Sequence, residues 1–252
     1  MKLRVSGSGS ALVLLHGFCE TGIIWHDVAN ALSADYLIIV PDLPGFGETE
    51  ASAESLEEWA VSLHQAILPI TKNNKITLIG HSMGGYVALA FAELFPDMVA
   101  ALGLFHSAVL QDTPEKKENR YKTIDFINNY GVKPFVKEII PGIYAPDAPK
   151  QWIEKSMEIA LNLSKEGIIK ALKAMAERPD RTVVLKNLTV PILVVAGKYD
   201  GLIPLQTQAE QALLAEKSQF VILENSGHMG IFEEAEKSLL ALTQFMHWVH
   251  SK

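Results

Sequence analysis

The chain has 252 residues, of which 48% are hydrophobic and 20% charged, so it can build one large core and is too apolar for a disordered protein. Its formal net charge of −7 argues against a nucleic acid partner, because binding to a phosphate backbone needs clustered Lys and Arg side chains. The single cysteine, Cys19, excludes an internal disulfide, and no apolar run approaches the roughly 18 residues of a membrane span. We therefore expect a cytoplasmic protein with no nucleic acid and no membrane among its partners; its oligomeric state stays open, with a homodimer as one alternative.

Short apolar runs alternate with helical patterns along the chain, which is typical of a mostly parallel sheet flanked by helices. The strands are predicted at residues 2–5, 11–16, 37–41, 75–80, 99–105, 191–197 and 219–223, the first as an antiparallel edge strand. The helices are predicted at residues 56–70, 84–95 and 233–249. Ser55 and Glu58 form a capping box at the start of the first helix, and the second is apolar on all sides and therefore expected to be buried. The pattern predicts an α/β fold.

This alternation stops at residues 107–185, where helical segments are separated by Gly and Pro and no strand-like run appears. The stretch is too long for an ordinary connection between a strand and the next one. We predict an α/β core of residues 1–106 and 186–252, interrupted by a helical insertion at 107–185.

The sequence Gly-His-Ser-Met-Gly at residues 80–84 follows a predicted strand and opens a predicted helix. This Gly-x-Ser-x-Gly pattern in this context is typical of a nucleophile elbow, in which a tight turn exposes the serine. The glycines are expected because a Cβ atom at Gly80 or Gly84 would collide with the adjoining strand or helix. Ser82 is therefore the candidate nucleophile, and the alternative is a serine that caps the helix.

A serine nucleophile needs a base, and a base of this kind needs a carboxylate that fixes its tautomer. His228 lies in the loop after the last predicted strand, and Asp200 follows the strand before it. The chain order Ser, Asp, His agrees with a catalytic triad of Ser82, Asp200 and His228. The alternative for Asp200 is a turn residue in an Asp-Gly turn. His81 and His16 lie beside glycines and are expected to form local hydrogen bonds.

Acyl transfer also needs backbone donors for the negatively charged oxygen of the intermediate. The N–H of Met83, directly after the nucleophile, is one candidate for this oxyanion hole, and the N–H of Phe18, in the loop after the strand at 11–16, is the other. Cys19 lies beside that loop but lacks an elbow, and we interpret it as a small buried residue.

Together these segments resemble the α/β-hydrolase superfamily, specifically its serine hydrolase and esterase branch with a helical cap. The matching motifs are HGF with Trp25 downstream, PDLPGFGET, GHSMGG, GKYDGLIP and NSGHMGIFEE. The resemblance covers nearly the whole chain and assigns the same roles to Ser82, Asp200, His228, Phe18 and Met83. It also implies that the insertion at 107–185 roofs the active site. The dehalogenase and epoxide-hydrolase branches carry Asp at the nucleophile position, so Ser82 argues against both.

The leading functional hypothesis is a carboxylesterase-like enzyme that hydrolyses esters of small or medium apolar substrates through an acyl-enzyme on Ser82. Six cap aromatics could line an apolar pocket or could instead pack the cap's own core: Tyr121, Phe126, Tyr130, Phe135, Tyr144 and Trp152. The partner is expected to be a small-molecule substrate, with no cofactor and no metal. The same fold also carries lactonases, thioesterases, carbon–carbon bond hydrolases, perhydrolases and lyases, as well as slow, ligand-binding receptors, and these alternatives remain open.

Overall fold

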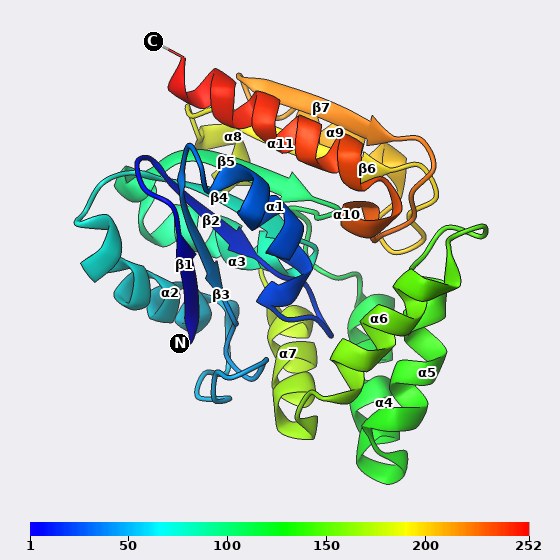
Figure 1. The fold of residues 1–252 in the computed structure, drawn as a ribbon. Helices are drawn as coiled ribbons and strands as arrows, with labels where there is room; N and C mark the ends of the chain where they lie inside the picture. The colour runs from blue at the N-terminus through cyan, green and yellow to red at the C-terminus, as the bar shows by residue number, and fades with distance from the viewer. Residues whose placement is uncertain (252) are drawn as a thin grey trace.

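The centre of the molecule is a seven-stranded sheet with helices on both faces (Figure 1). The computed structural model describes residues 1–251. Within them the strands lie in the order β1-β3-β2-β4-β5-β6-β7, and only β1 runs antiparallel to its neighbour, β3. The strands are β1 Leu3–Ser6, β2 Ala11–Leu15, β3 Leu37–Pro41, β4 Ile76–His81, β5 Val99–Phe105, β6 Ile192–Gly197 and β7 Ser218–Leu223. The predicted α/β fold class is confirmed, including the antiparallel edge strand.

The inner strands are buried because helices cover both sides of the sheet. Every residue of β2, β4 and β6 is buried. Each predicted strand agrees with the observed one to within one residue at either end. For the inner strands the reason is burial on both faces, which leaves a largely apolar run in the sequence.

The order of the strands reverses beside β2. The chain passes from β2 to β3 toward one edge and then returns to place β4 on the other side of β2. In open parallel sheets, ligands bind at the carboxyl ends of the strands next to such a reversal. The loops after β2 and β4, which carry Phe18 and Ser82, are therefore placed at the expected position of a binding site.

Helices α1 and α11 lie over the face of the sheet turned toward the viewer in Figure 1, and α2 and α3 lie behind it. The helices that pack on the sheet or on each other are α1 His26–Leu32, α2 Leu56–Thr71, α3 Met83–Leu94, α8 Thr182–Asn187, α9 Leu205–Ala212 and α11 Ala235–His250. The short helix α10, Gly230–Glu233, precedes α11. Three of these agree with the predicted helices, whereas α1 and α9 were not predicted.

The first turn of α2 is stabilised by Ser55, as the sequence predicted. The Ser55 hydroxyl accepts a hydrogen bond from the N–H of Glu58 at 3.2 Å. The Glu58 carboxylate, however, accepts from the N–H of Glu54 at 2.6 Å instead of returning to Ser55. The capping box is therefore displaced by one residue on its carboxylate side.

Between β5 and β6 the chain leaves the sheet and forms four helices, α4 to α7, which stand at the lower right in Figure 1. Their bounds are α4 Pro114–Tyr130, α5 Val132–Gly142, α6 Lys150–Leu161 and α7 Lys165–Glu177. We call residues 114–177 the helical insertion. Helix α4 packs against α7, and α5 packs against α6. Within residues 1–251, no helix combines the length and apolarity needed to cross a membrane.

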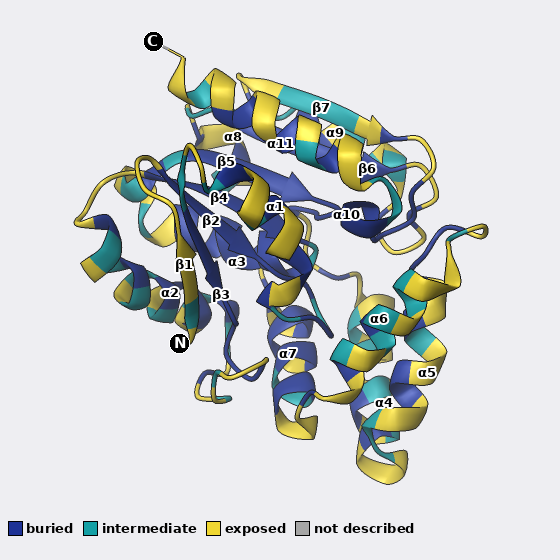
Figure 2. Ribbon diagram, viewed as in Figure 1, coloured by how far each residue is buried: buried dark blue, intermediate teal, exposed yellow. Residues whose placement is uncertain are grey.

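The chain returns to the core at Arg181, just before α8. The Arg181 side chain is 2% exposed and pairs with Glu93 of α3 at 3.0 Å and with Glu57 of α2. Figure 2 shows the contrast in burial, with a dark central sheet and exposed outer faces on α4, α5 and α6. The contacts of α8 are with α3 of the core, although this helix begins inside the segment 107–185.

Candidate active site

Ser82 lies at the sharp junction between β4 and α3. Its backbone has φ 49° and ψ −116°, a conformation that is strained for any residue with a side chain. A Cβ atom at Gly80 would lie 2.3 Å from the backbone of Gly84, and one at Gly84 would lie 2.6 Å from the carbonyl oxygen of Leu15. The close approach of helix and strands therefore requires both glycines, as the sequence predicted.

The Ser82 hydroxyl does not cap α3, although Ser82 occupies the N-cap position. Its backbone is held instead, because its N–H donates to the carbonyl of Phe105 at 2.9 Å and its own carbonyl accepts from the Ser107 hydroxyl at 2.7 Å. The alternative interpretation of Ser82 as a capping residue is wrong, and its side chain is left available to the cavity described below.

His228 and Asp200 meet at the carboxyl edge of the sheet. The Nδ1 atom of His228 donates to Oδ2 of Asp200 at 2.9 Å, and both side chains are buried. The other oxygen of Asp200 accepts from the N–H groups of Leu202 and Ile203 at 2.9 and 3.0 Å. Asp200 therefore orients the imidazole and also organises its own turn, so the two interpretations of this residue are compatible.

Asp200 is ionised despite its burial. Burial alone would raise its pKa, but the electrostatic attraction of His228 and the hydrogen bonds from His106 and His228 outweigh that effect and lower the pKa well below its usual range. A carboxylate that remains charged holds the Nδ1–H tautomer of His228, so the Nε2 atom of that ring is left as the proton acceptor.

His106 is a site residue that sequence reasoning missed. It directly follows β5, has φ 49°, and donates from Nδ1 to Oδ2 of Asp200 at 3.2 Å. Burial lowers the pKa of His106 to about 4, so the ring is neutral at pH 7. Its position at the end of a buried strand was a signal, but its partner lies 94 residues further along the chain.

Glu20 and His81 form a second buried pair behind the active site. His81 donates from Nδ1 to Oε2 of Glu20 at 2.9 Å and from Nε2 to the carbonyl oxygen of His228 at 2.9 Å. The expectation that His81 forms only local hydrogen bonds is wrong, because both partners are distant in sequence. His16 differs: its Nδ1 contacts the adjacent carbonyl of Gly17, while its Nε2 accepts from the distant N–H of Leu43.

The contacts of this pair favour the charged form of each member, because both ring nitrogens of His81 face oxygen atoms. Burial alone would lower the pKa of His81, but the charge of Glu20 and its hydrogen bond raise it. Burial alone would raise the pKa of Glu20, but the charge of His81 lowers it. An imidazolium with two donors therefore connects Glu20 to the backbone of His228.

The backbone N–H groups of Phe18 and Met83 are available as donors. Met83 is the first residue of α3, so its N–H has no acceptor within the helix. The N–H of Gly17 donates to Glu20, whereas that of Phe18 makes no hydrogen bond within residues 1–251. Phe18 and Ser82 line the same cavity. These are the two groups that the sequence proposed for an oxyanion hole.

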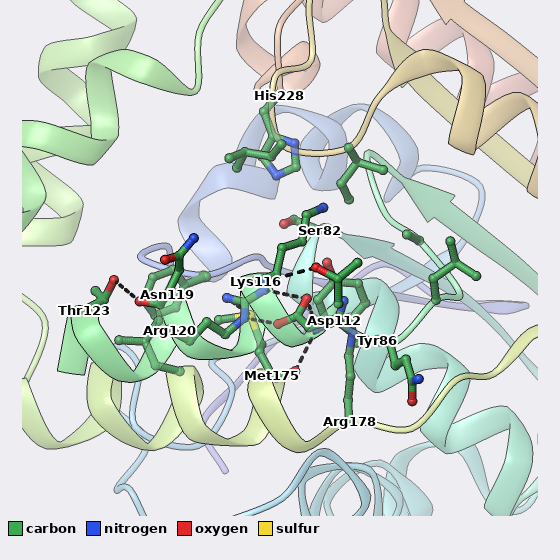
Figure 3. Close-up of a pocket in the computed structure, with 18 of the residues that line it drawn as sticks. Ser82, Tyr86, Asp112, Lys116, Asn119, Arg120, Thr123, Met175, Arg178 and His228 are labelled. Carbon is green, nitrogen blue, oxygen red and sulfur yellow. Dashed lines mark hydrogen bonds and ion pairs between the residues drawn. The ribbon is translucent and has the colours of Figure 1, made fainter. Parts of the chain in front are cut away.

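A cavity of about 470 Å³ lies between the core and the helical insertion. Ser82 and His228 both line it, and Figure 3 shows them beside charged residues of the insertion. Its apolar lining includes Phe18, Tyr86, Ala108, Phe135, Ile139, Leu172, Met175 and Ile203. Residues of α4, α5 and α7 contribute to the wall, so the insertion helps to shape the site.

The four aromatic residues predicted for the substrate pocket do not line this cavity. Tyr121 is exposed and donates to Glu177, and Tyr130 is 67% exposed. Tyr144 is buried, with its hydroxyl bonded to the carbonyl oxygen of Trp152 and to Ser156. The Trp152 ring stacks on that of Phe232, with centroids 5.4 Å apart. The prediction of a pocket role is therefore wrong for all four; of the six cap aromatics, Phe135 alone lines the cavity.

Three potential metal ligands also lie together: His106, Asp200 and His228 offer ligand atoms within 4.8 Å of one another. Both histidines use Nδ1 to donate a proton to the same oxygen of Asp200. A cation at this point would have to displace both protons. The geometry therefore favours a hydrogen-bonded carboxylate over a metal ligand.

The chain matches known proteins along almost its whole length. A model of the alpha/beta hydrolase family covers residues 12–241. A thermophilic esterase from Thermogutta terrifontis, solved with malate bound, is 32% identical with a TM-score of 0.94, covering 99% of this chain and 94% of that one. The pimeloyl-[acyl-carrier protein] methyl ester esterase of Vibrio cholerae is 27% identical over 96% of each chain. The proline iminopeptidase of Saccharolobus solfataricus is 28% identical over 98% of this chain and 88% of that protein.

Proposed function

The chain belongs to the alpha/beta hydrolase family, and we propose that it is a serine hydrolase that cleaves small or medium carboxylic esters through an acyl-enzyme on Ser82. One observation carries this proposal. Ser82 is held in a strained elbow with no capping bond, and it faces the same cavity as His228, whose ring is fixed by Asp200.

In the proposed reaction, the Ser82 hydroxyl attacks the carbonyl carbon of the ester. His228 takes the serine proton at Nε2 and then gives it to the leaving alcohol. Asp200 stabilises the imidazolium that forms in between. A water molecule, activated by the same His228, then releases the acid and restores Ser82.

The N–H groups of Phe18 and Met83 would bind the negatively charged oxygen of the tetrahedral intermediate. This assignment is supported by their free donors and by the position of Met83 at the N-terminus of α3, where the helix dipole favours negative charge. The helical insertion would act as the cap that closes the pocket over the substrate.

The choice of an ester is supported by relatives from Thermogutta terrifontis and Vibrio cholerae that are named as esterases. A relative named as an iminopeptidase makes amide hydrolysis the main competitor. The apolar side chains that line the cavity beside Ser82, such as Phe135 and Leu172, are compatible with an acyl chain next to the ester group.

The test combines covalent labelling with substrate profiling. A fluorophosphonate should add one adduct on the peptide that contains Ser82, and p-nitrophenyl esters of increasing chain length should be hydrolysed faster than the matched p-nitroanilides. Ser82→Ala and His228→Ala should each lower kcat by about 10⁴-fold or more.

The proposal is wrong if Ser82 stays unlabelled in the folded protein. Labelling with faster turnover of the anilides would instead indicate a peptidase. Labelling with negligible turnover, together with stabilisation by a ligand, would favour the receptor alternative.

A further inference from the structure

The wall of the active-site cavity is positively charged, in contrast to the chain as a whole. The cavity is lined by three cationic side chains, those of Lys116, Arg120 and Arg178, and by a single acidic one, that of Asp112. The chain has 29 acidic residues and 22 Lys and Arg residues. Within the cavity the balance is thus reversed, and its charged lining favours a negatively charged ligand.

Asp112 neutralises only part of this charge. Its side chain is 2% exposed and is held by Arg120 and by Nη1 of Arg178, the latter at 2.9 Å. Figure 3 shows the three side chains converging in the cavity near Tyr86. One carboxylate against two guanidinium groups leaves one positive charge. Lys116, which forms no ion pair within residues 1–251, adds a second at the exposed rim.

Arg178 is built into the site and has unused donors. Its side chain is 6% exposed, its Cζ atom lies 4.1 Å from the centre of the Tyr86 ring, and Nη1 also donates to the carbonyl oxygen of Met175 at 2.7 Å. Its Nε atom is buried and has no partner among the described residues. Of the five N–H donors of a guanidinium, only those on Nη1 of Arg178 have partners among the described residues, so an anion that enters the cavity has donors left to accept from.

The charged group lies close to the nucleophile. Tyr86 lies on α3 four residues after Ser82, which directly precedes the helix, so the two are about one helical turn, roughly 6 Å, apart along its axis. Arg178 lies over the Tyr86 ring. A ligand with its ester at Ser82 therefore needs only a short apolar chain to bring a second group to the guanidinium.

We propose that this cavity selects esters that carry a free carboxylate a few carbon atoms from the scissile bond, held by Arg120, Arg178 and Lys116. The inference rests on the proposed esterase function and adds the class of substrate. The carboxylate belongs either to the acyl part of the ester or to its alcohol part, and in either position it would bind the same three cationic side chains.

Two matched pairs of substrates test the proposal. Monoethyl glutarate and monoethyl adipate, compared with ethyl pentanoate and ethyl hexanoate, place the carboxylate in the acyl part. 4-Acetoxybutanoate, compared with butyl acetate, places it in the alcohol part. In one of these comparisons the charged ester should have a kcat/KM roughly ten- to a hundredfold above that of its neutral partner, as expected for a charge-assisted hydrogen bond.

Variants connect the preference to the named side chains. Arg120→Met, and separately Lys116→Met at the exposed rim, should lower the ratio of kcat/KM for charged and neutral esters, with Arg120→Met removing most of it. Lys122→Met is the matched control, because Lys122 lies on the same helix but pairs with Glu118 outside the cavity. This control removes one positive charge from the chain and should leave the ratio at the wild-type value.

Binding of the free dicarboxylates decides the question without turnover. Calorimetry should detect glutarate or adipate, but not glutaramide, and Arg120→Met should weaken that binding about tenfold or more. Hydrolysis of neutral esters with no charge preference and no dicarboxylate binding would overturn the inference and leave the esterase intact. Dicarboxylate binding with no hydrolysis of any ester, and no labelling of Ser82, would overturn the proposed function instead.

Discussion

Replacing Glu20 with Gln should strongly destabilise the protein, because it removes the counter-charge of a buried imidazolium. The side chains of Glu20 and His81 are 7% and 0% exposed, and the charged atoms lie 2.9 Å apart. Breaking a buried pair by removing one partner costs about 3–5 kcal/mol. A domain is typically stable by only about 5–15 kcal/mol, so the loss should be easy to measure.

The effect of Glu20→Gln should depend on pH. The pKa of Glu20 is lowered from 4.5, so its contribution is complete above pH 4.5 and is lost as the pH falls through the lowered value. The pKa of His81 is raised from 6.5, so its contribution is complete below pH 6.5 and is lost as the pH rises through the raised value. The difference in unfolding free energy between wild type and variant should therefore be largest between pH 4.5 and 6.5.

The assay is urea unfolding at several pH values, combined with steady-state kinetics. Since His81 donates to the carbonyl of His228, the variant should also lower kcat, by about tenfold to a hundredfold if the base is displaced. Glu118→Gln is the control, because Glu118 pairs with Lys122 on the surface and should change stability little. A stability loss no larger than that of the control, or one that is constant from pH 5 to pH 9, would refute the role of the charged pair.

Three further variants test the pocket, the packing of the helical insertion and the burial of Cys19. Phe135→Ala should shift the preferred acyl chain length, because Phe135 lines the cavity. Trp152→Ala should lower stability by about 3 kcal/mol, the low end for such a change because the ring is only partly buried, and should leave that preference unchanged, since Trp152 stacks on Phe232. Chain-length profiles and thermal unfolding check both, and a reversed outcome would contradict the pocket. Cys19→Ala should leave the fluorophosphonate adduct unchanged. Iodoacetamide should not modify the folded wild-type protein, because burial raises the pKa of the Cys19 thiol well above its usual range. Alkylation of the folded protein would show that this region opens.

The strands were predictable because burial on both faces leaves a local signal in the sequence. The five residues of β2 and the six of β4 are all buried; β2 is a continuous apolar run, and β4 is mostly apolar, with polar side chains only at Thr77 and His81. Helices α1 and α9 were missed for the opposite reason. They are short, with 7 and 8 residues, and partly polar, so they offer too few turns for a helical period to appear.

The triad could be proposed from sequence because each member follows a strand that is itself predictable. The residues that support it could not. Glu20 lies 61 residues from His81, and His106 lies 94 residues from Asp200. Those distances close only because β2 pairs with β4, which brings the Glu20 loop to His81, and β5 pairs with β6, which brings His106 to the Asp200 loop. No local pattern in the sequence encodes that order of strands.

The pocket was mispredicted because composition does not specify which face of a helix points toward a cavity. Arg120 and Tyr121 are neighbours on α4, and successive helical residues point about 100° apart. Only Ile124 and Ile127 are buried in this helix, so it has no broad apolar stripe that would identify its inner face. Its packing against α7 turns Arg120 toward Asp112 and leaves Tyr121 with Glu177 at the surface. In a polar insertion of this kind, specificity should be sought in charged side chains whose partners lie inside the cavity, because aromatic residues are as readily used to pack the insertion itself.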